Sequence, residues 1–302
     1  MSNLITYLAY DLVIESLIPC PELLTIERTI DSQVKIEFAS VPDVLQFPRF
    51  VGYKFEASRK EILINTKFIA KILVTNGNRI AVEPRMQANE GMIRLLLFGW
   101  GIGALLHQRN ILPLHGSGIT TQNGAVIFCA PSGTGKSTIV SRFLKRGYKL
   151  IDDNIIALKV QDKTHMATPG YPQLKLRRDA FKDWEKEPFS LNAPIMFNDP
   201  KFMVNVRPFF ENCAQPVRKI YVMTRNNATS LKIVPLHGAS LFHALEMNTF
   251  CKQYLQGMGK LGWHFNELQK LAKNVPVYEV NLPNPMPSPD TLADALEKNF
   301  LE

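Results

Sequence analysis

The alternation of apolar and polar residues predicts strands in the first third of the chain. Residues 34–38 alternate strictly and residues 61–64 loosely, and residues 68–74 lead through an Asn-Gly turn into the run at 79–82. Alternation with a period of two, joined by such a turn, is typical of a β-hairpin. The pattern therefore predicts a small, mainly antiparallel β unit over residues 1–88, in which nothing indicates chemistry.

From residue 89 the spacing of apolar residues changes, and helices and strands are mixed. Residues 90–109 have helical spacing, residues 124–129 form a short apolar run typical of a buried strand, and residues 136–146 have helical spacing that ends at Gly147. Further strands are predicted at 148–158, 201–207, 218–223, 230–236 and 275–280, helices from 238, around 268–272 and at 291–300, and a loop at 185–200. We expect a second domain, of α/β class, over residues 89–302.

A glycine-rich loop joins the apolar strand to the helix that follows it. Residues 130–137 match the phosphate-binding pattern G-x-x-x-x-G-K-[ST] at every fixed position but the first, where Ala130 stands. In this pattern the glycines let backbone N–H groups point at phosphate oxygens, the lysine adds charge near the β- and γ-phosphates, and the hydroxyl ligates Mg²⁺. The residues predicted to bind nucleotide are Ala130, Pro131, Ser132, Gly133, Thr134, Gly135, Lys136, Ser137 and Thr138.

Polar residues on both sides of this loop are candidates for the chemistry. Asp152 and Asp153 interrupt an apolar strand, where unpaired carboxylates are costly, so we expect them at a strand end in a cleft. A carboxylate there can hold Mg²⁺ or take a proton from a hydroxyl nucleophile. His115 lies one predicted strand before the loop and is either an active-site or a structural histidine. Arg207 is either a γ-phosphate clamp or a surface cation.

Composition limits the classes of function. The 302 residues are 46% apolar and 21% charged, which is enough for a buried core. The net charge of +8 comes from scattered basic residues without a basic arm, so a nucleic-acid partner is not expected. The four cysteines form no C-x-x-C pair, which is typical of a reducing cytosol. No apolar segment reaches the about 20 residues of a membrane span, so we expect a cytoplasmic protein with no membrane partner.

Four short motifs, in order, resemble the catalytic domain of HPr kinase/phosphorylase. They are Leu-His-Gly at 114–116, Gly-Lys-Ser at 135–137, Arg-Gly at 146–147 and Asp-Asp at 152–153. The Pro-Gly-Tyr-Pro segment at 169–172, and a β unit placed before the kinase domain, are more similar to the compact kinases of lasso-peptide biosynthesis. Those kinases phosphorylate a serine near the C-terminus of a ribosomal precursor peptide. The resemblance implies a P-loop, HPr-kinase-like α/β domain with a mixed central sheet.

The resemblance also implies roles for single residues, with ATP and Mg²⁺ as cofactors. Lys136 would bind the β- and γ-phosphates, Ser137 would bind Mg²⁺, and His115 would be an active-site residue. The aspartate pair would supply the base. Counting forward from Ser137 without a gap sets Asp153 and Asn154 against the family's pair, so we favour Asp153 as the base and as a metal-binding residue.

One departure from the family's pattern concerns the metal. The family has a metal-binding glutamate in a Leu-Glu-Ile-Arg segment, and Lys175 stands in that place here. A protonated lysine cannot hold Mg²⁺. The second metal contact is therefore lost or moved, and the reverse phosphorylase activity is not assumed.

These observations lead to one hypothesis and two alternatives. The hypothesis is an ATP/Mg²⁺-dependent kinase that transfers the γ-phosphoryl to a serine hydroxyl of a lasso-type precursor peptide, with Asp153 as the base and Lys136 and Arg207 stabilising charge. One alternative is an HPr-type regulatory serine kinase/phosphorylase. The other is a non-catalytic, nucleotide-dependent peptide-binding module. The sequence leaves a homo-oligomer open.

Overall fold

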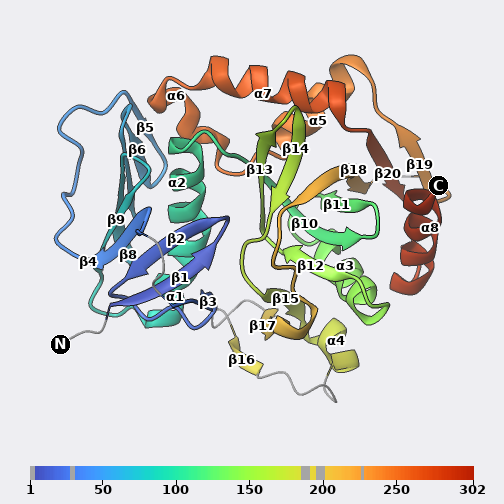
Figure 1. The fold of residues 1–302 in the computed structure, drawn as a ribbon, viewed down its shortest axis with the longest axis horizontal. Coiled ribbons are helices and arrows are strands. Elements are labelled where there is room, and N and C mark those ends of the chain that lie inside the picture. Colours follow the sequence, from blue (N-terminus) through green and yellow to red (C-terminus); the bar gives the residue numbers. More distant parts are fainter. Residues whose placement is uncertain (1–3, 28–30, 185–190, 195–200, 226–227) are drawn as a thin grey trace. The chain divides into compact units, whose positions relative to one another are not determined.

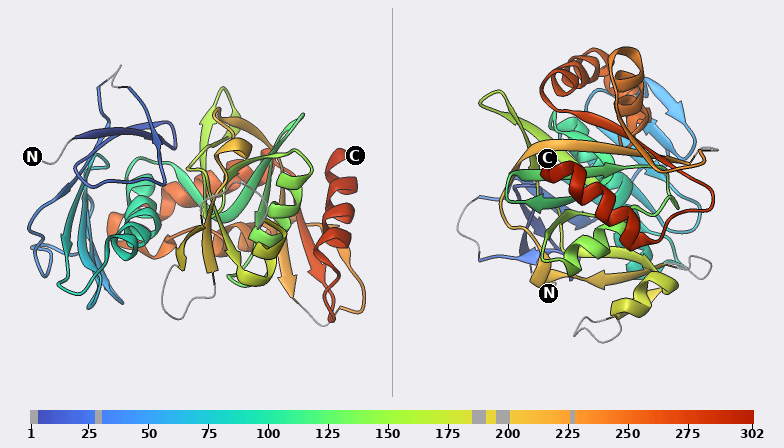
Figure 2. Two further views of the ribbon diagram at one scale, coloured as in Figure 1. Left: turned by 90° about the horizontal axis from the view of Figure 1, so that it is seen from below. Right: turned by 90° about the vertical axis from the view of Figure 1, so that its right-hand side faces the viewer.

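The computed structural model contains two compact units (Figures 1 and 2). One unit comprises Met1–Pro113 and Phe250–Asn266, and the other comprises Leu114–Thr249 and Glu267–Glu302. This division differs from the predicted boundary at residue 88, because the helical segment after residue 88 belongs to the first unit, as does a segment from much later in the chain. The residues that the structure describes are 4–27, 31–184, 191–194, 201–225 and 228–302.

A 9-stranded sheet forms the first unit, in the order β3-β1-β2-β4-β9-β8-β7-β6-β5. Its strands are β1 Ile5–Ala9, β2 Leu12–Ser16, β3 Leu24–Thr25, β4 Val34–Phe38, β5 Phe50–Gly52, β6 Phe55–Ala57, β7 Glu61–Asn65, β8 Ala70–Thr75 and β9 Arg79–Pro84. The predicted Asn-Gly hairpin is β8–β9, with Asn76 and Gly77 at φ of 54° and 68°. The pattern did not indicate the β1–β2 hairpin, because β2 is buried along its whole length and therefore does not alternate.

The segment predicted as one helix at 90–109 is helical but contains a wider turn. It forms α1 Glu90–Leu96, the π-helical turn η1 Leu97–Gly101 and α2 Ile102–Gln108. A β-carbon on Gly103 would lie 2.9 Å from the Phe250 ring. The glycine therefore lets α2 pack closely against the returning segment of the same unit.

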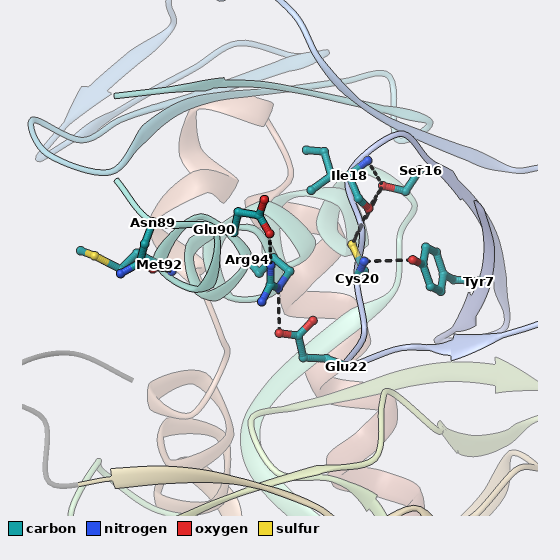
Figure 3. Close-up of polar contacts among 9 residues, drawn as sticks. All are labelled: Tyr7, Ser16, Ile18, Cys20, Glu22, Asn89, Glu90, Met92 and Arg94. Carbon is teal, nitrogen blue, oxygen red and sulfur yellow. Dashed lines mark hydrogen bonds and ion pairs between the residues drawn. The ribbon is translucent and has the colours of Figure 1, made fainter. Parts of the chain in front are cut away.

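Figure 3 shows the polar contacts that hold α1 in the first unit. Arg94 Nε donates to Glu22 at 2.8 Å, and its Nη1 donates to Glu90 at 3.3 Å. The side-chain oxygen of Asn89 accepts the Met92 N–H at 2.8 Å, which caps the start of α1. Because Glu22 lies between β2 and β3, its ion pair with Arg94 ties the helix to the N-terminal strands.

The second unit has a mixed sheet in the order β11-β10-β13-β14-β18-β20-β19, in which β12 also pairs with β10 and β11 also pairs with β18. Its strands are β10 Leu112–Thr121, β11 Gly124–Cys129, β12 Lys149–Asp152, β13 Ile155–Gln161, β14 Thr164–Thr168, β18 Gln215–Arg225, β19 Lys232–Pro235 and β20 Val277–Leu282. The pairs β11–β18 and β18–β20 are parallel. A separate 3-stranded sheet is formed by β15 Gln173–Arg177, β17 Lys201–Asn205 and β16 Leu191–Pro194.

The helices complete both units. Those of eight or more residues from residue 114 onward are α3 Lys136–Lys145, α5 Gly238–Met247, α7 Leu261–Asn274 and α8 Pro289–Leu301. The shorter ones are α4 Arg178–Phe181, η2 Lys182–Trp184, η3 Arg207–Phe209, η4 Lys252–Tyr254 and α6 Leu255–Met258. Within the described ranges, no helix is long and apolar enough to cross a bilayer.

Aromatic rings join the helices α3 and α8 to the sheet of the second unit. Phe128 of β11 stacks on Phe143 of α3, with 5.5 Å between ring centroids, and on Tyr221 of β18 at 5.7 Å. Phe300 of α8 lies 5.4 Å from Phe143, and the two helices run side by side (Figures 1 and 2). This packing fixes both the strand and the helix that the glycine-rich loop connects.

A charged cluster joins the end of α3 to α8. Arg146 follows the last residue of α3 and forms ion pairs with Asp294, at 2.6 Å, and with Glu297. The Tyr148 hydroxyl donates to Glu297 at 2.7 Å. Gly147 ends the helix at a φ of 91°, as its position in the sequence predicts.

Two sequence expectations changed in this unit. The apolar run at 148–158 is two strands, β12 and β13, in which Asp152 is the last residue of β12 and Asp153 lies in the turn that follows. The segment at 185–200 was expected as a loop, and of it the structure describes only Leu191–Pro194, which form β16. The last helix has the expected cap, because Ser288 Oγ accepts the Thr291 N–H at 3.1 Å.

The aromatic packing leads to a stability prediction. Phe143 is 0% exposed, so Phe143→Ala should lower the free energy of unfolding by about 3–5 kcal/mol, through lost burial and the cavity that remains. The matched control is Phe68→Ala at a phenylalanine that is 62% exposed, for which a change below about 1 kcal/mol is expected. Urea unfolding measures both, and equal effects would contradict the packing.

Candidate active site

The glycine-rich loop between β11 and α3 has the backbone conformation that its sequence requires. Gly133 and Gly135 have φ of 85° and 111°, in the left-handed region that side chains disfavour. Gly135 is also the N-cap of α3, and it contributes no side-chain bond to the free N–H groups of the first turn. A helix N-terminus preceded by such a loop can bind an anion.

The lysine of the loop is folded into it. Lys136 is 9% exposed, and its Nζ donates to the carbonyl oxygens of Ala130 at 2.6 Å and Pro131 at 3.3 Å. The Thr134 hydroxyl donates to the same Pro131 oxygen at 2.9 Å. The cation therefore lies within the loop whose N–H groups are the expected phosphate ligands.

The two adjacent aspartates have different hydrogen-bond partners. Asp152 Oδ1 accepts the N–H groups of Asn154 at 2.7 Å and Ile155 at 2.9 Å, so this carboxylate closes the turn between β12 and β13. Asp153 Oδ1 accepts the Ser117 hydroxyl of β10 at 2.5 Å. Asp152 therefore stabilises its own turn, whereas Asp153 contacts another element.

Three donors from three elements surround the Asp153 carboxylate. The Lys175 N–H of β15 donates to Oδ2 at 2.8 Å, Ser117 donates to Oδ1, and the Ser137 side chain of α3 is also hydrogen-bonded to the carboxylate. Burial raises the pKa of Asp153, and these hydrogen bonds oppose that rise. With 7% of its surface exposed, Asp153 is a buried acid next to the first turn of α3.

The oxygen donors at this point fit a magnesium ion. A carboxylate and a serine hydroxyl lie in contact at Asp153 and Ser137, and Mg²⁺ is usually bound by one or two carboxylates together with waters and phosphate oxygens. Among the described residues, at this site as elsewhere, no cluster of three or more His, Cys, Asp or Glu side chains could hold a metal. Lys175 contacts Asp153 through its backbone N–H, and its charge further lowers the pKa of that carboxyl.

His115 lies on the strand that carries Ser117. Because successive side chains of a strand alternate, these two residues share one face of β10. The His115 N–H donates to the Asn248 carbonyl at 2.7 Å, and Gly116 pairs with Cys129, the last residue before the loop. The strand register therefore brings His115 level with the start of the glycine-rich loop.

Two arginines are relevant to the loop, Arg207, which the sequence indicated, and Arg225, which it did not. Arg207 is exposed in the turn η3 after β17, where its N–H donates to Asn205 Oδ1 at 3.1 Å. Arg225, the last residue of β18, donates through Nη2 to the Gly133 carbonyl of the loop at 3.2 Å. Arg225 therefore contacts the loop, and the role of Arg207 as a γ-phosphate clamp stays a prediction.

Sequence reasoning missed Ser117 and Arg225 as site residues, although each had a signal. Ser117 follows His115 by two positions, so strand alternation alone would have placed both on one face. Arg225 ends a strand that is the parallel neighbour of β11, and parallel neighbours end at the same edge of a sheet. That second signal requires the strand order, which the sequence pattern does not give.

The comparison with solved structures gives partial matches. No family model matches the chain, and no curated protein does. The solved structure of the HPr(Ser) kinase/phosphatase from Coxiella burnetii matches with 12% sequence identity and a TM-score of 0.35, covering 63% of this chain and 96% of that chain. At that TM-score the match does not by itself assign a fold or an activity.

The buried carboxyl predicts a pH-dependent stability. Because the folded-state pKa of Asp153 is raised, its contribution to stability is full below the unfolded-state pKa and is lost as pH rises through the folded-state pKa. Asp153→Asn stays neutral, and its amide can accept from the Lys175 N–H and donate to Ser117 Oγ. The variant should therefore gain stability relative to the parent between about pH 4 and about pH 8.

Urea unfolding of the parent and the variant at both pH values measures this gain. Asp153→Ala is the control, because it leaves both donors without an acceptor and should be less stable than Asp153→Asn at either pH. A difference between Asp153→Asn and the parent that does not change with pH would contradict a raised pKa.

Proposed function

We propose that this protein is an ATP- and Mg²⁺-dependent kinase that transfers the γ-phosphoryl group to a serine hydroxyl of a ribosomal precursor peptide. The observation that carries the proposal is the buried Asp153 carboxylate, hydrogen-bonded to Ser137 at the first turn of α3. This contact puts a candidate proton acceptor beside the predicted phosphate site. The resemblance of the sequence to HPr kinases and to lasso-peptide kinases supports a serine of a protein or peptide as the acceptor.

The residues around the glycine-rich loop suggest how the donor is held. The loop N–H groups and Lys136 would bind the β- and γ-phosphates, and Arg225 would face the same loop from the end of β18. Ser137 and Asp153 would hold the metal, which when bound neutralises phosphate charge. His115 is also a proposed active-site residue, because the pairing of β10 with β11 brings it level with the start of the loop.

Asp153 would act as the base for the acceptor hydroxyl. As the bond between the serine oxygen and the γ-phosphorus forms, the bond to the ADP leaving group breaks and the hydroxyl proton passes to the Asp153 carboxylate. Burial raises the pKa of this carboxyl, which makes it a stronger base than an exposed aspartate. Ser117 and the Lys175 N–H would fix its orientation.

Phosphoryl transfer should depend on Asp153 and Lys136. With ATP, Mg²⁺ and a synthetic peptide with a C-terminal serine, we expect a mass gain of one phosphoryl group on the peptide. Asp153→Asn and Lys136→Ala should each lower the rate by at least about 100-fold. Asp152→Asn is the matched control and should stay close to the parent, because asparagine keeps the oxygen that accepts from Asn154 and Ile155.

The outcomes of this assay separate the alternatives. Tight nucleotide binding without transfer, unchanged by Asp153→Asn, would favour a nucleotide-dependent binding module. Transfer only to a folded carrier protein, with reversal driven by phosphate, would favour the HPr-type regulatory enzyme. Loss of activity in Asp152→Asn but not in Asp153→Asn would overturn the choice of base.

Ser117 should tune the pH dependence of the reaction. Removing its hydrogen bond in Ser117→Ala destabilises the ionised carboxylate, so the pKa of Asp153 should rise further and the rising limb of the pH–rate profile should move to higher pH. At neutral pH the rate should fall by about tenfold. Ser141→Ala is the matched control, because Ser141 is a buried serine whose hydroxyl bonds the Thr138 carbonyl and should leave the profile in place.

A further inference from the structure

The end strand of the first unit's sheet presents an open edge. β5 pairs with β6 on one side and is the last strand in the sheet order. Val51, in the middle of β5, is 65% exposed, and Tyr53, the first residue after β5, is 80% exposed. An edge strand with exposed apolar side chains can accept another extended chain through backbone hydrogen bonds.

The loop before β5 is anchored by buried polar contacts. Lys71 is 6% exposed, and its Nζ donates to the Val41 carbonyl at 2.5 Å and pairs with Glu83 at 2.9 Å. Glu83 in turn accepts the Val41 N–H at 2.6 Å. Further along the loop, the Leu45 N–H donates to Glu56 on β6 at 2.7 Å. The chain that leads into β5 is therefore held on the sheet at two points.

This anchored loop nevertheless exposes a large apolar side chain. Val41 and Leu45 are buried in a cluster with Leu63, whereas Phe47, two residues after Leu45, is 76% exposed. Exposed aromatic rings on a fixed backbone are typical of docking surfaces, because little conformational entropy is lost when they bind.

A basic cavity lies beside Phe47 at the end of the sheet. Its volume is about 460 Å³. The residues that matter for binding are Phe47, Arg49, Arg59, Lys60, Glu61 and Thr75. Three of these side chains are cationic and one is anionic. Among the described residues, no carboxylate forms an ion pair with any of the three cations.

The frame around this cavity is fixed, and one of its hydroxyl groups has no partner. The Lys60 carbonyl accepts the Asn76 N–H at 2.8 Å and Gln108 Nε2 at 3.1 Å, and Ser58 Oγ accepts the Glu61 N–H at 3.1 Å. Thr75 Oγ1 is buried without a hydrogen-bond partner among the described residues. Cations without a carboxylate partner on a rigid frame fit an anionic ligand.

We propose that the β5 surface, made of the β5 edge, Phe47 and the cavity cations, binds an extended acidic segment of a polypeptide. The segment adds a strand to β5, its acidic side chains contact Arg49, Arg59 and Lys60, and an apolar side chain packs on Phe47. This inference rests on the proposed function for the identity of the partner, which would be the substrate peptide. The cavity lies at the strand ends and includes Arg49, the residue before β5, and a cavity of this kind fits a chain better than a flat bilayer.

The experiment measures binding to the full chain by fluorescence anisotropy, without nucleotide. The probe is a fluorescein-labelled 12-residue peptide of alternating Glu and Val, and we expect saturable binding that weakens with salt. The double variant Arg59→Ala/Lys60→Ala should weaken binding by about tenfold. The matched control, Lys67→Ala/Lys232→Ala, removes two exposed charges outside the cavity and should bind as the parent does.

Two further probes test the mode of binding. A peptide of equal charge with proline in place of every valine cannot pair with the strand edge and should not bind. Phe47→Ala should weaken the Glu-Val peptide by at least about threefold. Equal binding of the proline peptide, equal loss in the control variant, or binding only to phosphatidylserine vesicles would overturn the proposal. Probe binding without phosphoryl transfer to any peptide would leave the β5 surface in place and contradict the kinase proposal instead.

Discussion

The Asp153 carboxylate is the point on which the arrangement of the second unit depends. A buried carboxylate is costly unless donors replace the water it has lost, and here the donors come from β10, α3 and β15. These elements are far apart in sequence. One side chain thus fixes where the glycine-rich loop's helix lies relative to two separate sheets. The same donors hold the carboxylate in a single orientation. Burial raises the pKa of Asp153, and the hydrogen bonds from these donors make that rise smaller.

Aromatic and charged contacts of α3 also fix the position of the glycine-rich loop. Phe128 precedes the loop and Phe143 follows it, and the two rings stack at 5.5 Å. Arg146 then ties the end of α3 to α8 through Asp294 and Glu297. The strand before the loop and the helix after it are therefore both fixed. Within the loop, a β-carbon on Gly133 or Gly135 would meet no atom within 4 Å, so the left-handed backbone rather than crowding requires glycine there.

Local elements were predictable from the sequence, and long-range pairings were not. The hairpin at Asn76, the α3 helix and its end at Gly147 follow from nearby residues alone, and the structure confirms them. Counting forward from Ser137 favoured Asp153 over Asp152. The count did not show the donors on β10 and β15 that hold the Asp153 carboxylate, because those elements are distant in the sequence. Arg225 was missed for the same reason, since only the parallel pairing of β18 with β11 brings it to the loop.

In the first unit, the loop that carries Phe47 is held by both apolar packing and charged contacts. The buried Lys71 side chain contacts Glu83, Asp43 and the Val41 carbonyl, and its ammonium group loses water that these acceptors replace. Ion pairs and hydrogen bonds are more directional than apolar packing, so they also fix the course of the loop backbone. On this backbone, Phe47 and Arg49 both line the cavity. In the proposal above, the peptide bound at the β5 surface also carries the acceptor hydroxyl. A weak interaction at this surface would then add to the affinity of the same peptide for the candidate active site, provided that the segment between the two points is long enough to reach both.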